Sequence, residues 1–268
     1  MKIRPAYLII LFLLLAIAGE SYYAKLPVVA ERTAPVMGTS VRVKVTGPGA
    51  PHWTLRAIYE LRRLDRLFSR YDRRSEIFLL NKLAGRAPLQ LSADTAAVLK
   101  MAEDVKRASG GAFDIRYATR DIDLGGIGKG YAVESARRLL LKKGVKSAII
   151  DLHSSIAVIG NGWRIGIKDP RDGEVLGVVI LNNGDALSTS GQYEQPGHIV
   201  DPRTGKKADR CLSVTVVAKD AALADALSTA VFVLGPADGW QLLERFGAKA
   251  FVIDRNGKTY DSIGVKLR

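Results

Sequence analysis

The chain has 268 residues, of which 47% are hydrophobic, and its 40 Lys and Arg against 27 Asp and Glu give a formal net charge of +13. This length and hydrophobic content predict one large folded domain and argue against intrinsic disorder. Cys211 is the only cysteine, so an intramolecular disulfide and a cysteine-based zinc cluster are both excluded.

The positive charge is spread over small clusters, such as Arg62-Arg63 and Lys142-Lys143, and stacking aromatic residues do not lie between them. A nucleic-acid surface needs basic residues gathered on one face. We therefore expect no nucleic-acid partner, and we interpret the charge as a general attraction for anionic ligands or membrane surfaces.

Residues 1–24 are predicted to be a signal peptide or an N-terminal anchor. Lys2 and Arg4 precede an uninterrupted apolar run over 6–18, in the order typical of export signals. The run is shorter than the roughly 20 residues that span a bilayer comfortably, so a retained inner-membrane anchor is the second choice. Either way, residues 33–268 are expected to form one periplasmic domain.

Hydrophobic periodicity then predicts alternating strands and helices without internal repeats. The expected strands are 36–46, 145–151, 155–159, 163–168, 175–181 and 211–219, with a closing hairpin near Asn256-Gly257. The expected helices are 53–68, a second one from Ser92 to Gly110, 129–143, 220–234 and 237–246. The first helix places Leu55, Ile58, Leu61, Leu64 and Phe68 on one face. We expect the α+β class, as a single compact domain with a mixed, largely antiparallel sheet and flanking helices.

A polar segment from Ser188 to Gly205 interrupts this pattern. It carries hydroxyls, His198, Asp201 and Arg203 between turn-forming residues, and it has too few apolar residues for a core. Its composition is equally compatible with a solvated connection between strands and with a loop kept for chemistry.

Asp225, Ser228 and Thr229 are spaced i, i+3 and i+4 on the helix predicted over 220–234, so they share one helical face. A carboxylate with hydroxyl oxygens suits a hard divalent cation such as Mg²⁺, which completes its shell with water and substrate phosphate. Taken alone, the same pattern also fits small polar residues packed against a neighbouring element.

Residues 123–130 read Asp-Leu-Gly-Gly-Ile-Gly-Lys-Gly and open the helix predicted over 129–143. Glycines allow close backbone approach, and a helix N-terminus favours anions, so the turn suits a phosphate. The spacing matches neither a P-loop nor a dinucleotide GxGxxG motif. Tight helix packing is the alternative interpretation.

Together these motifs resemble the ApbE family, the FAD:protein FMN transferases. Six segments occur in the family's order and span nearly the whole mature chain: Pro-Val-Met-Gly-Thr at 35–39, Phe-Ser-Arg-Tyr at 68–71, Gly-Ala-Phe-Asp at 111–114, the glycine-rich turn at 123–130, the polar segment at 188–205, and Ala-Asp-Ala-Leu-Ser-Thr-Ala at 224–230. The resemblance implies an ApbE-like, T-fold-related domain. It also implies metal-dependent transfer of FMN from FAD to a Thr or Ser hydroxyl of a target flavoprotein, such as a subunit of a membrane redox complex or a periplasmic reductase, with release of AMP.

The resemblance also implies roles for individual residues. Mg²⁺ ligands would come from Asp225, Ser228, Thr229 and the carbonyl of Gly126. Contacts to the flavin nucleotide would come from Met37, Tyr71, Ala112, Phe113, Asp114, Asp123 and Lys129. His198 is the candidate general base, because imidazole can accept a proton near neutral pH. Asp201 would orient it or hold the loop, and Arg203 would neutralise phosphate or pair with Asp201.

Two segments depart from the family pattern. Only residues 115–122 separate Asp114 from Asp123, where the family carries several tens of residues. Residues 151–154 read Asp-Leu-His-Ser, where the family generally has Asp-Leu-Gly-Gly. Three functions therefore stay open: FMN transfer, flavin binding without transfer, and metal-dependent hydrolysis of FAD to FMN and AMP.

Overall fold

The computed structural model describes residues 28–83, 88–116, 121–192 and 197–267. The signal peptide or anchor predicted over 1–24 lies outside these ranges. Within them, no helix combines the length and the apolar character that crossing a membrane requires.

The described residues form six helices and eleven strands. The helices are α2 (Ala50–Phe68), α3 (Glu76–Leu83), α4 (Ala93–Ala108), α5 (Gly128–Lys142), α6 (Ala221–Leu234) and α7 (Pro236–Arg245). The strands are β1 (Val29–Val36), β2 (Thr39–Thr46), β3 (Ser147–Leu152), β4 (Ser155–Ile159), β5 (Trp163–Lys168), β6 (Val175–Leu181), β7 (Ala186–Gly191), β8 (Cys211–Ala218), β9 (Lys249–Asp254), β10 (Thr259–Asp261) and β11 (Lys266–Leu267).

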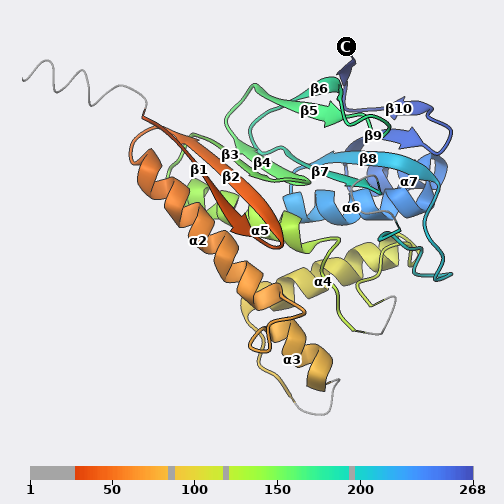
Figure 1. Ribbon diagram of the computed structural model, residues 1–268, viewed down its shortest axis with the longest axis horizontal. Coiled ribbons are helices and arrows are strands. Elements are labelled where there is room, and N and C mark those ends of the chain that lie inside the picture. The colour runs from red at the N-terminus through yellow and green to blue at the C-terminus, as the bar shows by residue number, and fades with distance from the viewer. Residues whose placement is uncertain (1–27, 84–87, 117–120, 193–196, 268) are drawn as a thin grey trace, which may run out of the picture.

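These elements build three layers (Figure 1). The central layer is an eight-stranded sheet in the order β1-β2-β3-β4-β7-β8-β9-β10, and a three-stranded sheet, β11-β6-β5, forms a second layer. Helices α2, α5 and α6 pack on the other face of the central sheet. Every strand pairing between the named strands is antiparallel. The expected α+β class, with a largely antiparallel sheet and flanking helices, is confirmed.

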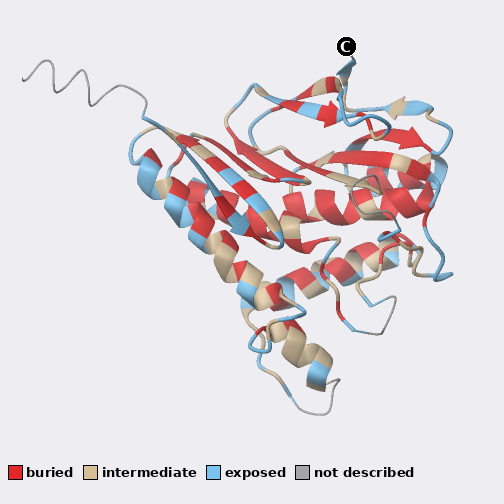
Figure 2. Cartoon of the chain, viewed as in Figure 1, coloured by how far each residue is buried: buried red, intermediate tan, exposed pale blue. Residues whose placement is uncertain are grey.

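Burial follows the layers (Figure 2). In β2, Val41, Val43 and Val45 are buried and alternate with more exposed residues, because only one face of this strand is covered. All five residues of β4 are buried, since β4 lies between the helices and the small sheet. Two hydrophobic clusters result, one under the helices and one between the sheets.

Three sequence-based expectations need correction. Residues 36–46 are the end of one strand and all of the next, because Met37 and Gly38 adopt positive φ and turn the chain between β1 and β2. Leu55 is 37% exposed, so it lies outside the apolar face of α2. Helix α3 was missed, because its apolar residues Ile77, Phe78, Leu79 and Leu80 are consecutive and show no helical spacing.

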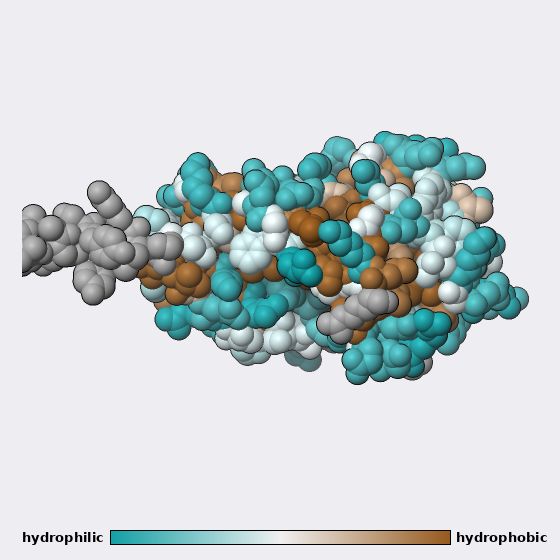
Figure 3. All heavy atoms as spheres, turned by 90° about the horizontal axis from the view of Figure 1, so that it is seen from above, coloured by the Kyte–Doolittle hydropathy of each residue, from teal (hydrophilic) through white to brown (hydrophobic). Residues whose placement is uncertain are grey.

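Most of the face seen from above is covered by hydrophilic side chains, while apolar side chains reach the surface near its middle (Figure 3). Apolar atoms make up over half of a typical folded protein's surface. This exposure is therefore ordinary and does not by itself mark an interface.

Helices α5 and α6 cross at Gly130, where the two backbones are in close contact. A Cβ at Gly130 would lie 2.2 Å from the carbonyl oxygen of Ala221 and 2.6 Å from Cβ of Asp225. We expect Gly130→Ala to lower the free energy of unfolding by about 3 kcal/mol, because a crowded contact with backbone cannot relax locally. Urea denaturation measures this change.

Gly128→Ala is the matched control in the same helix. Its Cβ would lie 3.4 Å from Cβ of Leu124, an ordinary contact, so stability should stay within about 1 kcal/mol of the wild type. Equal losses in the two variants would show that the crossing at Gly130 is not the cause.

Candidate active site

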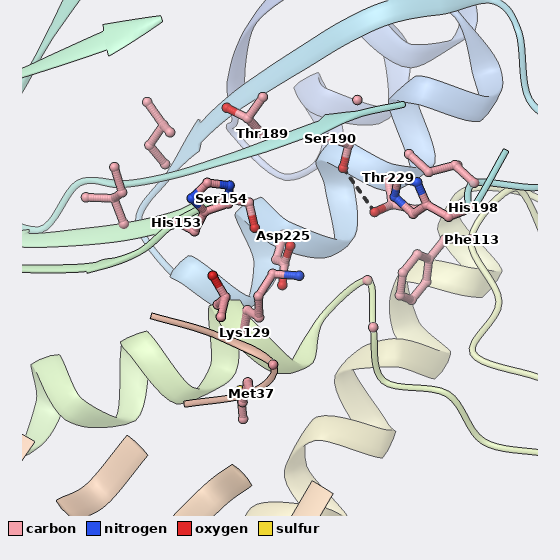
Figure 4. Close-up of a pocket in the computed structure, with 18 of the residues that line it drawn as sticks. Met37, Phe113, Lys129, His153, Ser154, Thr189, Ser190, His198, Asp225 and Thr229 are labelled. Carbon is pink, nitrogen blue, oxygen red and sulfur yellow. Dashed lines mark hydrogen bonds between the residues drawn. The ribbon is translucent and has the colours of Figure 1, made fainter. Parts of the chain in front are cut away.

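A cavity of about 1080 Å³ opens where the β1–β2 turn, the start of α5, the end of β7 and strand β5 meet. Its size is at the upper end of small-molecule sites, which span roughly 300–1,000 Å³, so a dinucleotide is a suitable occupant. Figure 4 shows side chains from these elements pointing into it. The cavity brings together ten of the twelve predicted site residues: Met37, Ala112, Phe113, Asp114, Asp123, Gly126, Lys129, His198, Asp225 and Thr229.

Asp225 lies at the junction of α6 with α5 and is only 4% exposed. Its Oδ2 accepts a hydrogen bond of 2.9 Å from the backbone N–H of Gly130, in the first turn of α5. The Ser188 hydroxyl lies 3.0 Å from its Oδ1 and 3.1 Å from the carbonyl oxygen of Ser154. The carboxylate therefore has donors on both of its oxygens, one from the start of α5 and one from β7.

Three hydroxyls extend the oxygen cluster beyond Asp225. Ser190 Oγ lies 2.7 Å from Ser228 Oγ. It also lies 3.2 Å from Thr229 Oγ1, the hydrogen bond that is dashed in Figure 4. Thr229 lines the cavity, whereas Ser228 is fully buried behind its wall and donates to the carbonyl oxygen of Asp225. The structure therefore places Ser228 among the supporting contacts, with Ser190 between it and Thr229.

The donor set fits a hard cation. A buried carboxylate, a threonine hydroxyl and a nearby backbone carbonyl are all oxygen ligands, which Mg²⁺ prefers. A Cβ at Gly126 would lie 3.2 Å from Thr229 Oγ1 and 3.1 Å from the Phe113 ring, so glycine keeps the space beside Thr229 open. Within the described ranges, no three His, Cys, Asp or Glu side chains form a metal-binding group. A cation here would thus rely on hydroxyl and carbonyl ligands besides Asp225.

The start of α5 presents the remaining polar groups. Lys129 is half-buried, and its amine points toward Asp225 (Figure 4). Asp123 forms an ion pair of 2.5 Å with Arg70 and accepts a hydrogen bond from the Gly125 N–H, so its carboxylate shapes the glycine turn. Asp114 pairs with Lys106 at 2.8 Å.

Tyr71 lies apart from this group. Its side chain is 81% exposed and does not line the cavity, and the Arg70 guanidinium lies 5.5 Å from the centre of its ring. Its predicted nucleotide contact thus has no counterpart in the geometry of the cavity, unlike that of Phe113, which is buried beside Gly126.

His198 reaches the cavity from the segment after β7 and is exposed at its mouth, near Thr229 and Phe113 (Figure 4). Gln192 braces this segment. Its amide nitrogen donates to the carbonyl oxygens of Ile199 and Ala208 at 3.1 and 2.7 Å, and its Oε1 accepts from the Gly197 N–H at 2.8 Å. These bonds fix the backbone on both sides of His198.

Asp201 and Arg203 form a bidentate ion pair, with N–O distances of 2.9 and 2.8 Å. The hydrogen bonds from Arg203 hold the pKa of the Asp201 carboxyl below its usual range. Asp201 also accepts hydrogen bonds from the backbone of Thr204 and Gly205 through its carbonyl oxygen. Of the two roles considered for each residue, the geometry favours pairing and support of the loop.

Cys211 belongs to strand β8, as the sequence indicated. Burial, with a smaller contribution from Asp254, raises the pKa of its thiol to about 12. A thiol that stays protonated is a poor nucleophile. Cys211 therefore takes no part in the chemistry of the cavity.

Sequence reasoning missed the supporting residues Ser188, Ser190 and Gln192. The first two lie in β7, where alternate side chains point to the same face, so both reach α6. Their period-2 spacing was the available signal. It was hidden because the end of β7 is polar and was assigned to the loop.

The chain is similar to known proteins of one family. The model of the ApbE family matches residues 37–121 and 118–252, and the two stretches meet in the short segment after Asp114. Three similar curated proteins are each named FAD:protein FMN transferase. The protein from Rhodobacter capsulatus is 35% identical over 48% of this chain and 27% of its own length. The protein from Escherichia coli K12 is 32% identical over 52% of this chain and 44% of its own. The protein from Vibrio cholerae is 26% identical over 79% of this chain and 83% of its own.

Solved structures agree on the fold. The flavin transferase ApbE from Vibrio cholerae has a TM-score of 0.79 at 23% identity, covering 88% of this chain and 97% of its own. The ApbE protein from Thermotoga maritima has a TM-score of 0.78 at 26% identity with the same coverage. The first curated relatives are matched over less than half of their own length.

Proposed function

The chain belongs to the ApbE family, and from this premise we propose that it is an FAD:protein FMN transferase, which moves FMN from FAD to a Thr or Ser hydroxyl of a target flavoprotein. The observation that carries the proposal is that one cavity joins Asp225 and Thr229 of α6 with Lys129 of α5 and with His198, three separate parts of the chain. Oxygen ligands, a cation and a proton acceptor are the groups that cleavage of a diphosphate needs.

The proposed reaction balances as a substitution at phosphorus. The acceptor hydroxyl oxygen forms a bond to the FMN phosphorus, and the bond from that phosphorus to the AMP oxygen breaks. The hydroxyl proton passes to His198, and AMP leaves. The position of His198 at the mouth of the cavity supports this role, because a hydroxyl on another protein must enter from outside.

We propose Mg²⁺ as the cation, held by Asp225, Thr229 and the Gly126 carbonyl, with Ser228 behind them. When bound, it would neutralise charge on the diphosphate oxygens. Lys129 adds a second positive charge beside the start of α5, where the helix N-terminus also favours anions. Arg203 is committed to Asp201 and has no part in this scheme.

The direct test combines two assays on the purified full-length protein. With FAD, Mg²⁺ and a candidate flavoprotein subunit, we expect AMP release measured by chromatography, together with a fluorescent target band in a denaturing gel. AMP without labelling would indicate FAD hydrolysis. Bound FAD with neither product would indicate a flavin-binding protein. Either of these last two outcomes would reject the transferase assignment.

For location, we propose the periplasm, with export by a signal peptide or retention by an inner-membrane anchor. The charge and apolar run of residues 1–24 support this proposal. Alkaline phosphatase fused to the C-terminal end of this segment should be active, because alkaline phosphatase forms its disulfides only after export. An inactive but stable fusion would contradict export.

A further inference from the structure

Met37 and His153 are the two non-glycine residues with positive φ in the described part of the chain, at 50° and 61°. Both line the same cavity. Left-handed backbone is unfavourable for residues with a Cβ, and such strain tends to persist where it serves a function. Met37 was predicted as a site residue from the sequence, whereas His153 was noted only as a departure from the family pattern.

The turn that holds His153 is anchored on both sides. The backbone N–H of His153 donates to Asp151 Oδ1 at 3.1 Å, and Arg42 holds the other carboxylate oxygen of Asp151 at 3.0 Å. The Ser154 carbonyl oxygen accepts from the Thr189 N–H at 2.9 Å. These contacts fix the direction in which the His153 side chain leaves the backbone.

This turn lies beside the candidate cation site. The Ser188 hydroxyl links the Ser154 carbonyl oxygen with Asp225 Oδ1, at 3.1 and 3.0 Å. Figure 4 shows His153 and Ser154 near Asp225, with His198 and Phe113 at the other end of the view. A dinucleotide whose diphosphate binds at Asp225 would therefore extend past this turn.

Ser154 supplies a second, independent observation. Its Oγ is buried and has no hydrogen-bond partner among the described residues, although the residue lines the cavity. A buried hydroxyl without a partner is unfavourable. A change of rotamer can turn it toward a ligand without breaking any hydrogen bond of the folded chain.

We propose that His153 and Ser154 form a contact site for FAD, in which the imidazole and the hydroxyl bind an oxygen-rich part of the dinucleotide, its diphosphate or its ribityl chain. The inference rests on the proposed function, and it assigns the pair to FAD rather than to the acceptor protein. The buried hydroxyl argues for this choice, because a small ligand in the cavity can reach it more readily than a protein segment at the mouth.

The test separates strain from binding. The equilibrium Kd for FAD is measured by flavin fluorescence with Mg²⁺ and without a target protein. His153→Gly should raise this Kd about fivefold to tenfold, as expected from the loss of one hydrogen bond. The same variant should keep or raise the Tm, because glycine relieves the positive-φ strain. If His153 had a merely structural role, its replacement would not lower FAD affinity while also stabilising the fold.

Further variants sharpen the assignment. Ser154→Ala should raise the FAD Kd by a smaller factor, about threefold. His153→Asn should recover part of the affinity, because asparagine tolerates left-handed backbone and keeps a polar side chain. His52→Gln, an exposed change in the first turn of α2, is the matched control and should leave the Kd unchanged.

Failure of the proposed function can be distinguished from failure of this inference. A wild-type protein that does not bind FAD would overturn the proposed function and this inference together. A wild-type protein that binds FAD, with an unchanged Kd in both His153→Gly and Ser154→Ala, would overturn only this inference. A rise confined to the KM for the target protein would also overturn it, since the pair would then belong to the acceptor site.

Discussion

Replacing Asp225 with alanine is expected to reduce AMP release from FAD at least about 10³-fold, a loss typical of removing a main electrostatic group from an active site. The Asp225 carboxylate lines the cavity together with Thr229, and it accepts hydrogen bonds from the Ser188 hydroxyl and the Gly130 N–H. Without this carboxylate, the proposed Mg²⁺ would bind weakly, and the negative charge of the diphosphate would lose the cation that neutralises it. Chromatographic measurement of AMP at saturating FAD and Mg²⁺ gives the rate.

The design must separate loss of chemistry from loss of fold, because Asp225 also accepts the Gly130 N–H. Asp225→Asn preserves the shape and one acceptor oxygen while removing the charge, so it should stay folded by circular dichroism and still lose most activity. An Asp225→Asn variant with normal activity across a Mg²⁺ titration would refute the proposed metal role. Activity that falls only in step with Tm would show a structural role.

Replacing His198 with alanine is expected to slow transfer by about 10²- to 10⁴-fold, the range typical of a general base. The Kd for FAD should change less than about twofold, because the imidazole acts on the acceptor hydroxyl rather than on the dinucleotide. The fluorescent-gel assay gives the transfer rate, and flavin fluorescence gives the Kd.

Added imidazole provides a stringent control for His198→Ala, because a small base can enter the space left at the exposed mouth of the cavity. Partial recovery of transfer with imidazole, but not in Asp225→Asn, would identify the missing group as a proton acceptor. An equal loss of FAD affinity and transfer rate would instead assign His198 to substrate binding.

Much of the fold could be predicted because its signals are local. Ser92 immediately precedes α4 and its side chain accepts a hydrogen bond from the Thr95 N–H. Asp220 caps α6 in the same way, accepting from the N–H groups of Ala222 and Leu223. Both residues are strong N-cap formers recognisable from sequence. Gly144 follows α5, as a glycine at a helix end predicts, and adopts positive φ.

From residue spacing alone, without the family resemblance, the site was predictable only where its residues share one element. The spacing of Asp225, Ser228 and Thr229 placed them on one face, but it could not reveal that Ser228 turns behind the wall toward Ser190. That contact depends on pairing of β7 with β4 and β8, which joins distant parts of the chain. The spacing within a polar strand does not show which distant strands it will pair with.

The nucleotide contact of Tyr71 stays a prediction from the resemblance alone. Its position matches the family segment at 68–71, yet its side chain points into solvent rather than into the cavity. Neighbouring Ser69 instead organises this turn, accepting hydrogen bonds from the N–H groups of Tyr71 and Asp72.

The bond between the Gly130 N–H and Asp225 has a consequence for how descendants of this chain can lose their activity. A related protein that has lost activity but kept the fold should still retain Asp225, because this residue also supports the crossing of α5 and α6. His198 can change without such a cost to the fold, since it is exposed at the mouth of the cavity. The amino acid at position 198, more than the one at position 225, should therefore distinguish active enzymes from folded but inactive relatives.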